Sequence, residues 1–258
     1  MNNTKKIEKG FWLTLALAVI IVILTGVAFL PSVIESRETS RAATVGYEVD
    51  AEAMRVLGCC NAYAAANDFT TTMTGTVKAK VVGVPYTQKI HGGRNVSRDG
   101  AFTDVAESSS ALVKAALKRE RRDGKYYVSR GDYKNKSFRY NNEKTLTEKQ
   151  YSAQYGQPFT GIVKYKLENA VVSATVVGDN VYKFVLDPAQ STLYSRNEVK
   201  TTLGSKSYPK YNLVEFTLTT DGERPIKVTA TEKFHVDKFG GTDCTAEYTE
   251  TFHFNSEL

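Results

Sequence analysis

The sequence predicts an α+β protein in which an N-terminal transmembrane helix precedes an antiparallel, strand-rich domain with a few packing helices. Two observations predict this fold class. Twenty consecutive residues from Phe11 to Leu30 carry no charge, and from Phe69 onward apolar and polar residues alternate with a period of two over long stretches. The first pattern is typical of a membrane span, and the second is typical of strands with one buried face.

The uncharged segment continues to Ile34 with few interruptions, so we expect a transmembrane helix over residues 11–34. A helix of about twenty residues rises ~30 Å, which matches the hydrocarbon core of a bilayer. Lysines dominate the charge of residues 1–10, whereas the charges just after the span cancel. The positive flank stays in the cytoplasm, so we expect the rest of the chain on the extracytoplasmic side of the cell membrane. A cleavable signal peptide is the alternative, and this long apolar run fits it less well.

Four segments follow from this interpretation. They are a cytoplasmic tail at 1–10, the transmembrane helix at 11–34, a polar stem at 35–46 and a single strand-rich domain at 47–258. Outside the tail, 31 basic and 27 acidic side chains leave only a mild positive balance, so we expect no nucleic-acid partner. The first expected partner is the lipid bilayer, through the N-terminal helix.

Three stretches of the domain predict helices. Residues 50–66 place apolar side chains at three- and four-residue steps, which predicts one buried stripe. Residues 147–155 and 188–203 each begin with a helix-start signal and end before a glycine. The stripe of the first helix consists of Ala53, Leu57, Cys60 and Ala64.

Period-two alternation predicts the strands. A long strand covers residues 69–82, and turn signals separate 113–121 from 126–128 and 170–177 from 182–186. The C-terminal third predicts an antiparallel meander with one apolar face. That face consists of Val214, Phe216, Leu218, Ile226, Val228, Ala230, Phe234, Val236, Cys244, Ala246, Tyr248, Phe252 and Phe254.

Two carboxylates interrupt this apolar face. Glu232 and Glu250 belong to adjacent strands of one hairpin, where we expect them directly opposite each other or one diagonal apart. A carboxylate on a buried face is costly unless it is paired. One interpretation is a wet pocket mouth, or pairing with Arg or Lys from a covering helix. The other is a polar anchor inside a ligand cavity, or an acid with a raised pKa.

The order of elements resembles the exported half-barrel family of lipoprotein carriers, the LolA and LppX type. The resemblance is carried by the helix at 50–66, the strand at 69–82, the strand-to-helix junction at 181–188 and the meander at 211–254. It implies a curved antiparallel half-barrel whose helices fill the concave face around an apolar pocket for acyl chains. The candidate ligand-binding residues are then Glu232, Phe234, Tyr248, Glu250 and Phe252.

Basic residues are concentrated in the stretch 114–139. This stretch predicts either a solvated hairpin or a surface that faces anionic headgroups or an anionic envelope polymer. The candidate surface basic patch consists of Lys114, Lys118, Arg119, Arg121, Arg122 and Lys125.

Three cysteines are present, Cys59, Cys60 and Cys244, and their spacing matches no zinc site, so we expect no metal. If the helix at 50–66 packs on the apolar face of the meander, Cys60 and Cys244 could form a disulfide. The alternative is that all three are small buried hydrophobic residues.

No common catalytic or cofactor-binding motif is present, so we expect neither an enzyme nor a cofactor. Two functional hypotheses follow. The first is a membrane-anchored, non-enzymatic binding domain for an apolar or lipid ligand. The second is an interaction or scaffold domain with a solid core, which binds a protein partner or an anionic envelope polymer.

Overall fold

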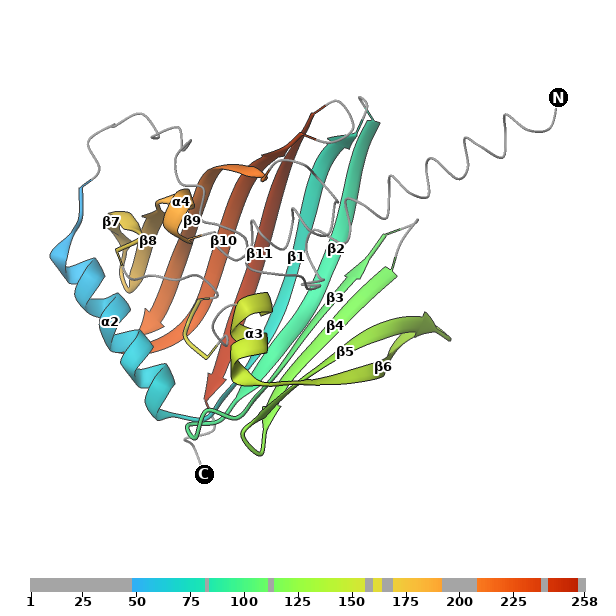
Figure 1. Ribbon diagram of the computed structural model, residues 1–258. Helices are drawn as coiled ribbons and strands as arrows, with labels where there is room; N and C mark the ends of the chain where they lie inside the picture. Colours follow the sequence, from blue (N-terminus) through green and yellow to red (C-terminus); the bar gives the residue numbers. More distant parts are fainter. Residues whose placement is uncertain are drawn as a thin grey trace.

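A computed structural model of the chain describes residues 48–81, 84–110, 114–155, 160–163, 169–191, 208–237 and 241–254. Eleven strands form one sheet in the order β6-β5-β4-β3-β2-β1-β11-β10-β9-β8-β7. Every neighbouring pair is antiparallel, and β6 and β7 are the first and last strands of this order. The sheet curves around a concave face, on which helices α2 and α3 lie (Figure 1).

The predicted antiparallel sheet with few helices is confirmed. The helices are α2 (Ala51–Ala66), α3 (Glu148–Tyr155) and α4 (Pro188–Ser191). The strands are β1 (Phe69–Val81), β2 (Val84–Val96), β3 (Phe102–Ser109), β4 (Lys114–Arg122), β5 (Lys125–Lys134), β6 (Ser137–Leu146), β7 (Val171–Gly178), β8 (Val181–Leu186), β9 (Lys210–Asp221), β10 (Arg224–Val236) and β11 (Thr242–Phe254).

Some predicted elements differ from those in the structure. β3 and β6 were not predicted, because polar residues occupy positions of both faces and no regular alternation of apolar and polar side chains results. Of the helix expected at 188–203, α4 forms the first turn, and residues 192–203 lie outside the described part of the chain. Within the described ranges no helix is long and apolar enough to cross a bilayer. The span predicted at 11–34 lies outside those ranges and stays a prediction.

Helix α2 begins at a side-chain cap and buries the predicted stripe. The carboxylate of Asp50 accepts a hydrogen bond from the Ala53 amide at 2.9 Å, which satisfies one of the open donors of the first turn. Just before the cap, Val49 pairs in parallel with Ala174 of the edge strand β7. The stripe consists of Ala53, Val56, Leu57, Cys60 and Ala64, all of them buried.

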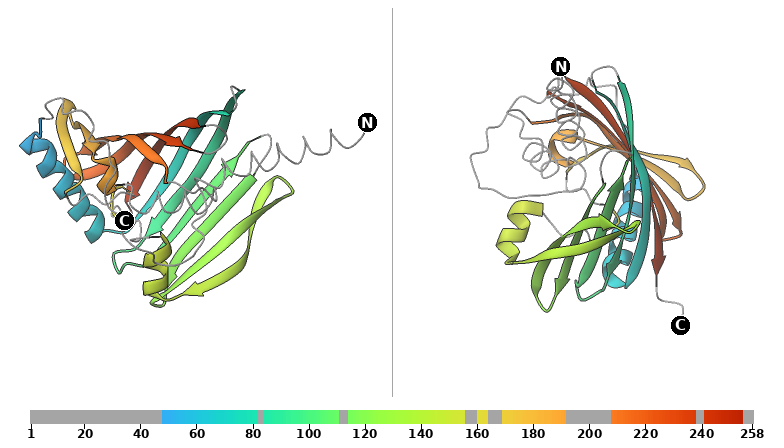
Figure 2. Two further views of the ribbon diagram at one scale, coloured as in Figure 1. Left: turned by 45° about the horizontal axis from the view of Figure 1, so that its top comes forward. Right: turned by 90° about the vertical axis from the view of Figure 1, so that its right-hand side faces the viewer.

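Three glycines allow strands to approach closely near the middle of the sheet. A Cβ atom on Gly92 would lie 2.1 Å from the Val105 carbonyl oxygen, and one on Gly93 would lie 2.2 Å from that of Thr71. A Cβ on Gly75 would lie 2.5 Å from the Cβ of Tyr248. Glycine in a strand interior marks such close approaches and the tight bends of barrel-like sheets. We infer that these positions help the sheet to curve, and the two views of Figure 2 show the curvature.

The concave face carries two clusters of buried apolar side chains. The larger, here called the lower cluster, includes side chains of α2, α3 and residues 160–163 together with those of the strands. The smaller, here called the upper cluster, lies toward the end of the sheet where β1 connects to β2 and β10 connects to β11. The upper cluster consists of Val77, Ala79, Ile90, Phe234, Val236, Cys244 and Ala246.

Candidate functional site

A buried ion pair lies on the concave face beside aromatic side chains of the lower cluster. Arg94 of β2 donates from Nε to the Glu250 Oε1 at 2.7 Å, and the hydroxyl of Thr71 donates to the same oxygen at 2.6 Å. The side chains of Arg94 and Glu250 are only 5% and 10% exposed. The guanidinium carbon also lies 5.6 Å from each of the ring centroids of Phe69 and Phe252. This geometry is a charge-assisted hydrogen bond flanked by aromatic rings.

The ion pair continues across the sheet as a row of alternating charges. Arg94 is the register partner of Asp104 in β3, and Asp104 is the register partner of Arg119 in β4. Arg119 donates from Nε to the Asp104 carboxylate at 2.8 Å, and both side chains are buried. Arg94 also donates from Nη1 to the Gly161 carbonyl at 2.7 Å. We call Glu250, Arg94, Asp104 and Arg119 the polar belt.

The structure corrects the predicted relation between the two carboxylates. Glu250 lies opposite Val228, whereas Glu232 lies opposite Ala246, so they are neither opposite each other nor one diagonal apart. The two positions are four residues apart along the strand direction, which is roughly 13 Å. The partner of Glu250 comes from strand β2 rather than from a covering helix.

Glu232 belongs to the upper half of the concave face. It is 5% exposed and accepts a hydrogen bond from the Tyr248 hydroxyl at 3.3 Å. One row of register partners runs from Glu232 through Ala246 and Val77 to Gln88. Small and apolar side chains therefore form the middle of this row, and polar side chains lie at its two ends.

The predicted ligand-binding residues share the concave face but do not form one site. Phe234 belongs to the upper cluster, whereas Tyr248 and Phe252 belong to the lower cluster. Glu232 lies beside the upper cluster, and Glu250 is held in the polar belt. Of the five, Glu232 and Phe234 are therefore the two that lie at the upper cluster.

The upper cluster differs from the lower one in what it packs against. All seven of its residues come from strands β1, β2, β10 and β11, and so far as the chain is described, none comes from a helix. Its partly buried neighbours Met73, Tyr86 and Tyr211 also lie on strands. The rings of Tyr211 and Phe234 approach to 5.0 Å between centroids. Burial is the main cause that raises the pKa of Tyr86, whose hydroxyl donates to Ser110 at 2.8 Å.

The sequence did not predict two buried polar side chains at the border of the upper cluster. Gln88 and Ser108 are both 0% exposed. Neither the amide of Gln88 nor the hydroxyl of Ser108 has a hydrogen-bond partner within the part of the chain that the structure describes. Ser108 is the register partner of Ile90, two residues along β2 from Gln88, so the two polar groups are diagonal neighbours on one face. One sequence feature could have identified Gln88 as buried. It occupies an even position of β2, as buried Ile90 and Val96 do.

The predicted surface basic patch is wrong, because strand alternation divides it between two faces. Arg119 and Arg121 share the face of buried Leu117, whereas Lys118 and Arg122 face the other way. Arg119 is buried against Asp104, and the Arg121 guanidinium donates to the Gly100 carbonyl at 3.0 Å.

The remaining members of the predicted patch do not form a free cationic surface either. Lys118 and Arg122 both pair with Glu120, at 2.8 Å and 3.2 Å, so this face is partly neutralised. The Lys114 ammonium lies 3.6 Å from the ring centroid of Tyr133, and Lys125 is exposed beside the β4–β5 turn.

The predicted disulfide is also wrong, because all three cysteines are free. The ring of Tyr63, near the end of α2, contacts that of Phe254 at 4.9 Å, whereas Cys244 lies ten residues earlier in β11. That strand length is roughly 33 Å, and Cys60 is only about one helical turn from Tyr63. The two thiols are therefore far beyond disulfide distance. Burial raises the pKa of Cys60 and that of Cys244 to about 12.

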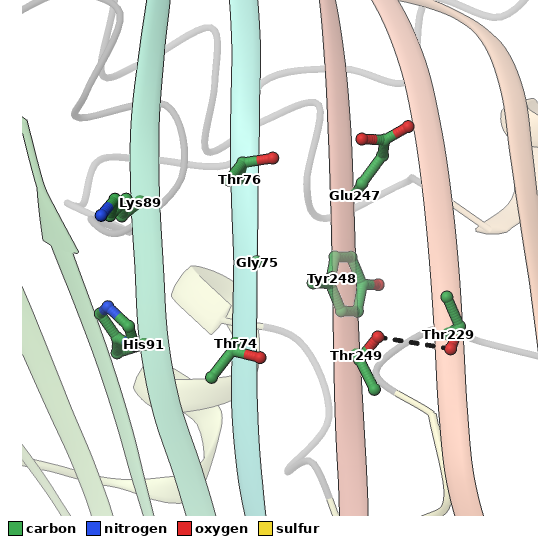
Figure 3. Close-up of a pocket in the computed structure, with 9 residues that line it drawn as sticks. All are labelled: Thr74, Gly75, Thr76, Lys89, His91, Thr229, Glu247, Tyr248 and Thr249. Carbon is green, nitrogen blue, oxygen red and sulfur yellow. Dashed lines mark hydrogen bonds between the residues drawn. The ribbon is translucent and has the colours of Figure 1, made fainter.

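A depression of about 350 Å³ lies on the opposite, convex face of the sheet (Figure 3). Its floor is at Gly75, where β1 and β11 approach closely, and the hydroxyls of Thr229 and Thr249 lie 3.3 Å apart beside it. The lining is formed by Thr74, Gly75, Thr76, Lys89, His91, Thr229, Glu247, Tyr248 and Thr249. Its residues come from four strands, so neither hairpin alone could have predicted it. Within the described ranges no group of three metal-ligating side chains is present.

No family model and no curated protein matches the chain. Among solved structures, the chain is similar to LprF from Mycobacterium bovis, with 11% identity and a TM-score of 0.39 over 81% of this chain and 96% of that one. A DUF1329 family protein from Desulfovibrio piger aligns with 8% identity and a TM-score of 0.33 over 80% of this chain and 94% of that one. A putative outer membrane lipoprotein-sorting protein domain from Vibrio parahaemolyticus gives 10% identity and 0.33 over the same shares.

Proposed function

We propose that this chain is a membrane-tethered, extracytoplasmic binding domain that holds an apolar ligand of lipid type on its concave face and catalyses no reaction. The tether is the helix predicted at 11–34, and the stem at 35–46 leads to the domain. The proposed site is the upper cluster. The observation that carries the proposal is that the described residues of this apolar cluster all come from strands, while the side chains of α2 and α3 belong to the lower cluster.

The chemistry of the upper cluster suits an acyl chain. Its central residues Ala79 and Ala246 are small, and Val77 and Ile90 complete an aliphatic floor. Ligand sites are mostly apolar and contain a few polar groups that orient the ligand. Glu232 at one end of the row and Gln88 at the other would supply such groups.

A solid-core interaction domain is the second candidate, and one observation favours it. The side chains of the upper cluster are only 1–7% exposed, as expected of a filled core. In that case the convex face, with its depression above Gly75, would be the surface for a protein partner or an envelope polymer.

Photocrosslinking of the full chain in mild detergent separates the two candidates. The probe is a fatty acid with a photoactivatable group on its chain, and the crosslinked peptides are mapped by mass spectrometry. The proposal predicts crosslinks to concave-face residues of β1, β2, β10 and β11 that excess unlabelled fatty acid abolishes. Crosslinks confined to residues 11–34, or equal on both faces of the sheet, would contradict it.

A further inference from the structure

Gln88 is an unusual residue for the interior of this sheet. Its side chain is 0% exposed, yet both the Oε1 and the Nε2 atoms lack hydrogen-bond partners within the described part of the chain. A primary amide has two donors and two lone pairs, and native proteins pair nearly all such buried groups. Leaving these atoms unpaired carries the full cost of removing them from water.

A second unpaired group lies beside it. The Ser108 hydroxyl is 0% exposed and likewise has no partner within the described ranges. The side chains of Gln88 and Ser108 share the concave face on neighbouring strands, one diagonal step apart. Together they offer donors and acceptors at one place on the border of the upper cluster. Both unpaired groups could therefore hydrogen-bond the same polar group of a ligand.

The strand positions that adjoin this pair in the described ranges are uncharged. The register partners of Gln88 and Ser108 on the adjoining strands are Val77, Ile90 and Ala115. The nearest basic side chain on this face of β2 is Arg94, which is already held by Glu250 and the Gly161 carbonyl. Among these described positions a charged headgroup would find no counter-ion, whereas a neutral carbonyl or hydroxyl group would find both a donor and an acceptor.

We propose that Gln88 and Ser108 form a polar subsite that hydrogen-bonds a neutral, carbonyl-bearing headgroup, such as the ester of an acylglycerol, whose acyl chain lies on the upper cluster. The inference rests on the proposed function and specifies its ligand. The Gln88 amide donates to the carbonyl oxygen, and its own oxygen accepts from a neighbouring hydroxyl of the ligand. Ser108 supplies a second donor to the same headgroup.

If Gln88 binds a ligand, its replacement should change stability and ligand binding in opposite directions, which a purely structural role would not predict. Gln88→Leu keeps the volume and removes the unpaired amide, so it raises the unfolding midpoint of the ligand-free chain. The same change weakens binding of a photoactivatable monoacylglycerol on the order of tenfold. It leaves crosslinking by a headless photoactivatable alkane unchanged, because the apolar surface is intact. Ser108→Ala acts in the same directions with smaller effects.

Thr220→Val is the matched control. The Thr220 hydroxyl is also buried and without a partner in the described ranges, but it lies in β9 at the far end of the sheet. Removal of this hydroxyl raises the unfolding midpoint and leaves binding of the monoacylglycerol and the alkane unchanged.

The outcomes separate this inference from the proposed function. If the alkane and the monoacylglycerol both fail to crosslink the concave face, the proposed function is wrong, and the proposed subsite is then wrong as well. If both probes crosslink and Gln88→Leu binds the monoacylglycerol as tightly as the unchanged chain, the subsite alone is overturned. A loss of stability in Gln88→Leu also overturns it, because the amide would then be part of the folded core.

Discussion

Single residues decide which parts of the concave face are fixed. In the polar belt, Glu250 receives hydrogen bonds from both Arg94 and Thr71, and Arg94 also holds the Gly161 carbonyl. Burying two charges is costly, but leaving one of them without the other is costlier still. The belt therefore holds β11, β1 and β2 in one register, and it ties residues 160–163 to the sheet.

A double-mutant cycle measures this role. Arg94→Met or Glu250→Leu alone leaves a buried charge without its partner, so each lowers the free energy of unfolding by about 3–5 kcal/mol. The double variant loses much less than the sum, because no lone charge remains. Urea unfolding of the full chain followed by circular dichroism gives these values. Strictly additive losses would show that the pair is not coupled.

The cysteines give a second test at this scale. Because burial raises the pKa of Cys60 and of Cys244 to about 12, few of these thiols are ionised at pH 8. Half-buried Cys59 is therefore alkylated first in the folded chain, and all three react after denaturation without a reductant. Mass spectrometry counts the labels, and a single label after denaturation would reveal a disulfide. The folded state keeps protons that unfolded thiols release above their ordinary pKa of 9.0, so stability falls as pH rises from 9 toward 12.

At the scale of elements, close strand approach shapes the sheet. Gly92 and Gly93 of β2 face backbone oxygens of β3 and β1 at distances that no Cβ atom tolerates. Those contacts are with backbone, so a neighbouring side chain cannot move aside to make room. These glycines lie on β2 between Ile90 of the upper cluster and Arg94 of the polar belt, and we expect the local bend of the sheet to depend on them.

Two glycine substitutions should act in opposite directions. Gly92→Ala forces a Cβ to 2.1 Å from the Val105 carbonyl, and we expect it to lower the unfolding midpoint strongly or to prevent folding. Gly58 is exposed in α2 with nothing within 4 Å of its added Cβ. Gly58→Ala should therefore raise stability by about 0.5–1 kcal/mol through helix propensity. Thermal unfolding of both variants checks this, and a tolerated Gly92→Ala would contradict the close approach.

Much of the element order could be predicted from alternation alone. Val228, Ala230 and Phe234 are buried as their parity in β10 predicted, and α2 buries its predicted stripe. The side chains that pair across the sheet could not be predicted, because Arg94 and Glu250 are 156 residues apart in the sequence. Their contact depends on β1 lying between β2 and β11, which no local pattern reveals. Gln88 lies in phase with buried Ile90, but that its amide has no partner in the described ranges depends on the neighbouring strands and could not be predicted.

At the scale of the whole molecule, the proposal places the domain outside the membrane that holds its N-terminal helix. A cysteine introduced by Lys227→Cys, at an exposed position of β10, should react with a membrane-impermeant thiol reagent in intact cells. One introduced by Thr4→Cys should react only after the cells are opened. Both variants carry Cys59→Ser to remove the background. The reverse pattern of labelling would contradict the proposed orientation.

The central claim is that the upper half of the concave face holds one apolar ligand. Ala246 lies in the middle of the upper cluster and is 6% exposed, whereas its neighbour Thr245 faces the other side of the sheet. Ala246→Trp should therefore fill the site, and Thr245→Trp should not.

Native mass spectrometry of the full chain, purified from membranes in mild detergent, tests the claim most directly. The account predicts one bound lipid on the unchanged chain and on Thr245→Trp, and none on a folded Ala246→Trp variant. A chain that carries no lipid, or an Ala246→Trp variant that folds and carries as much as Thr245→Trp, would contradict it.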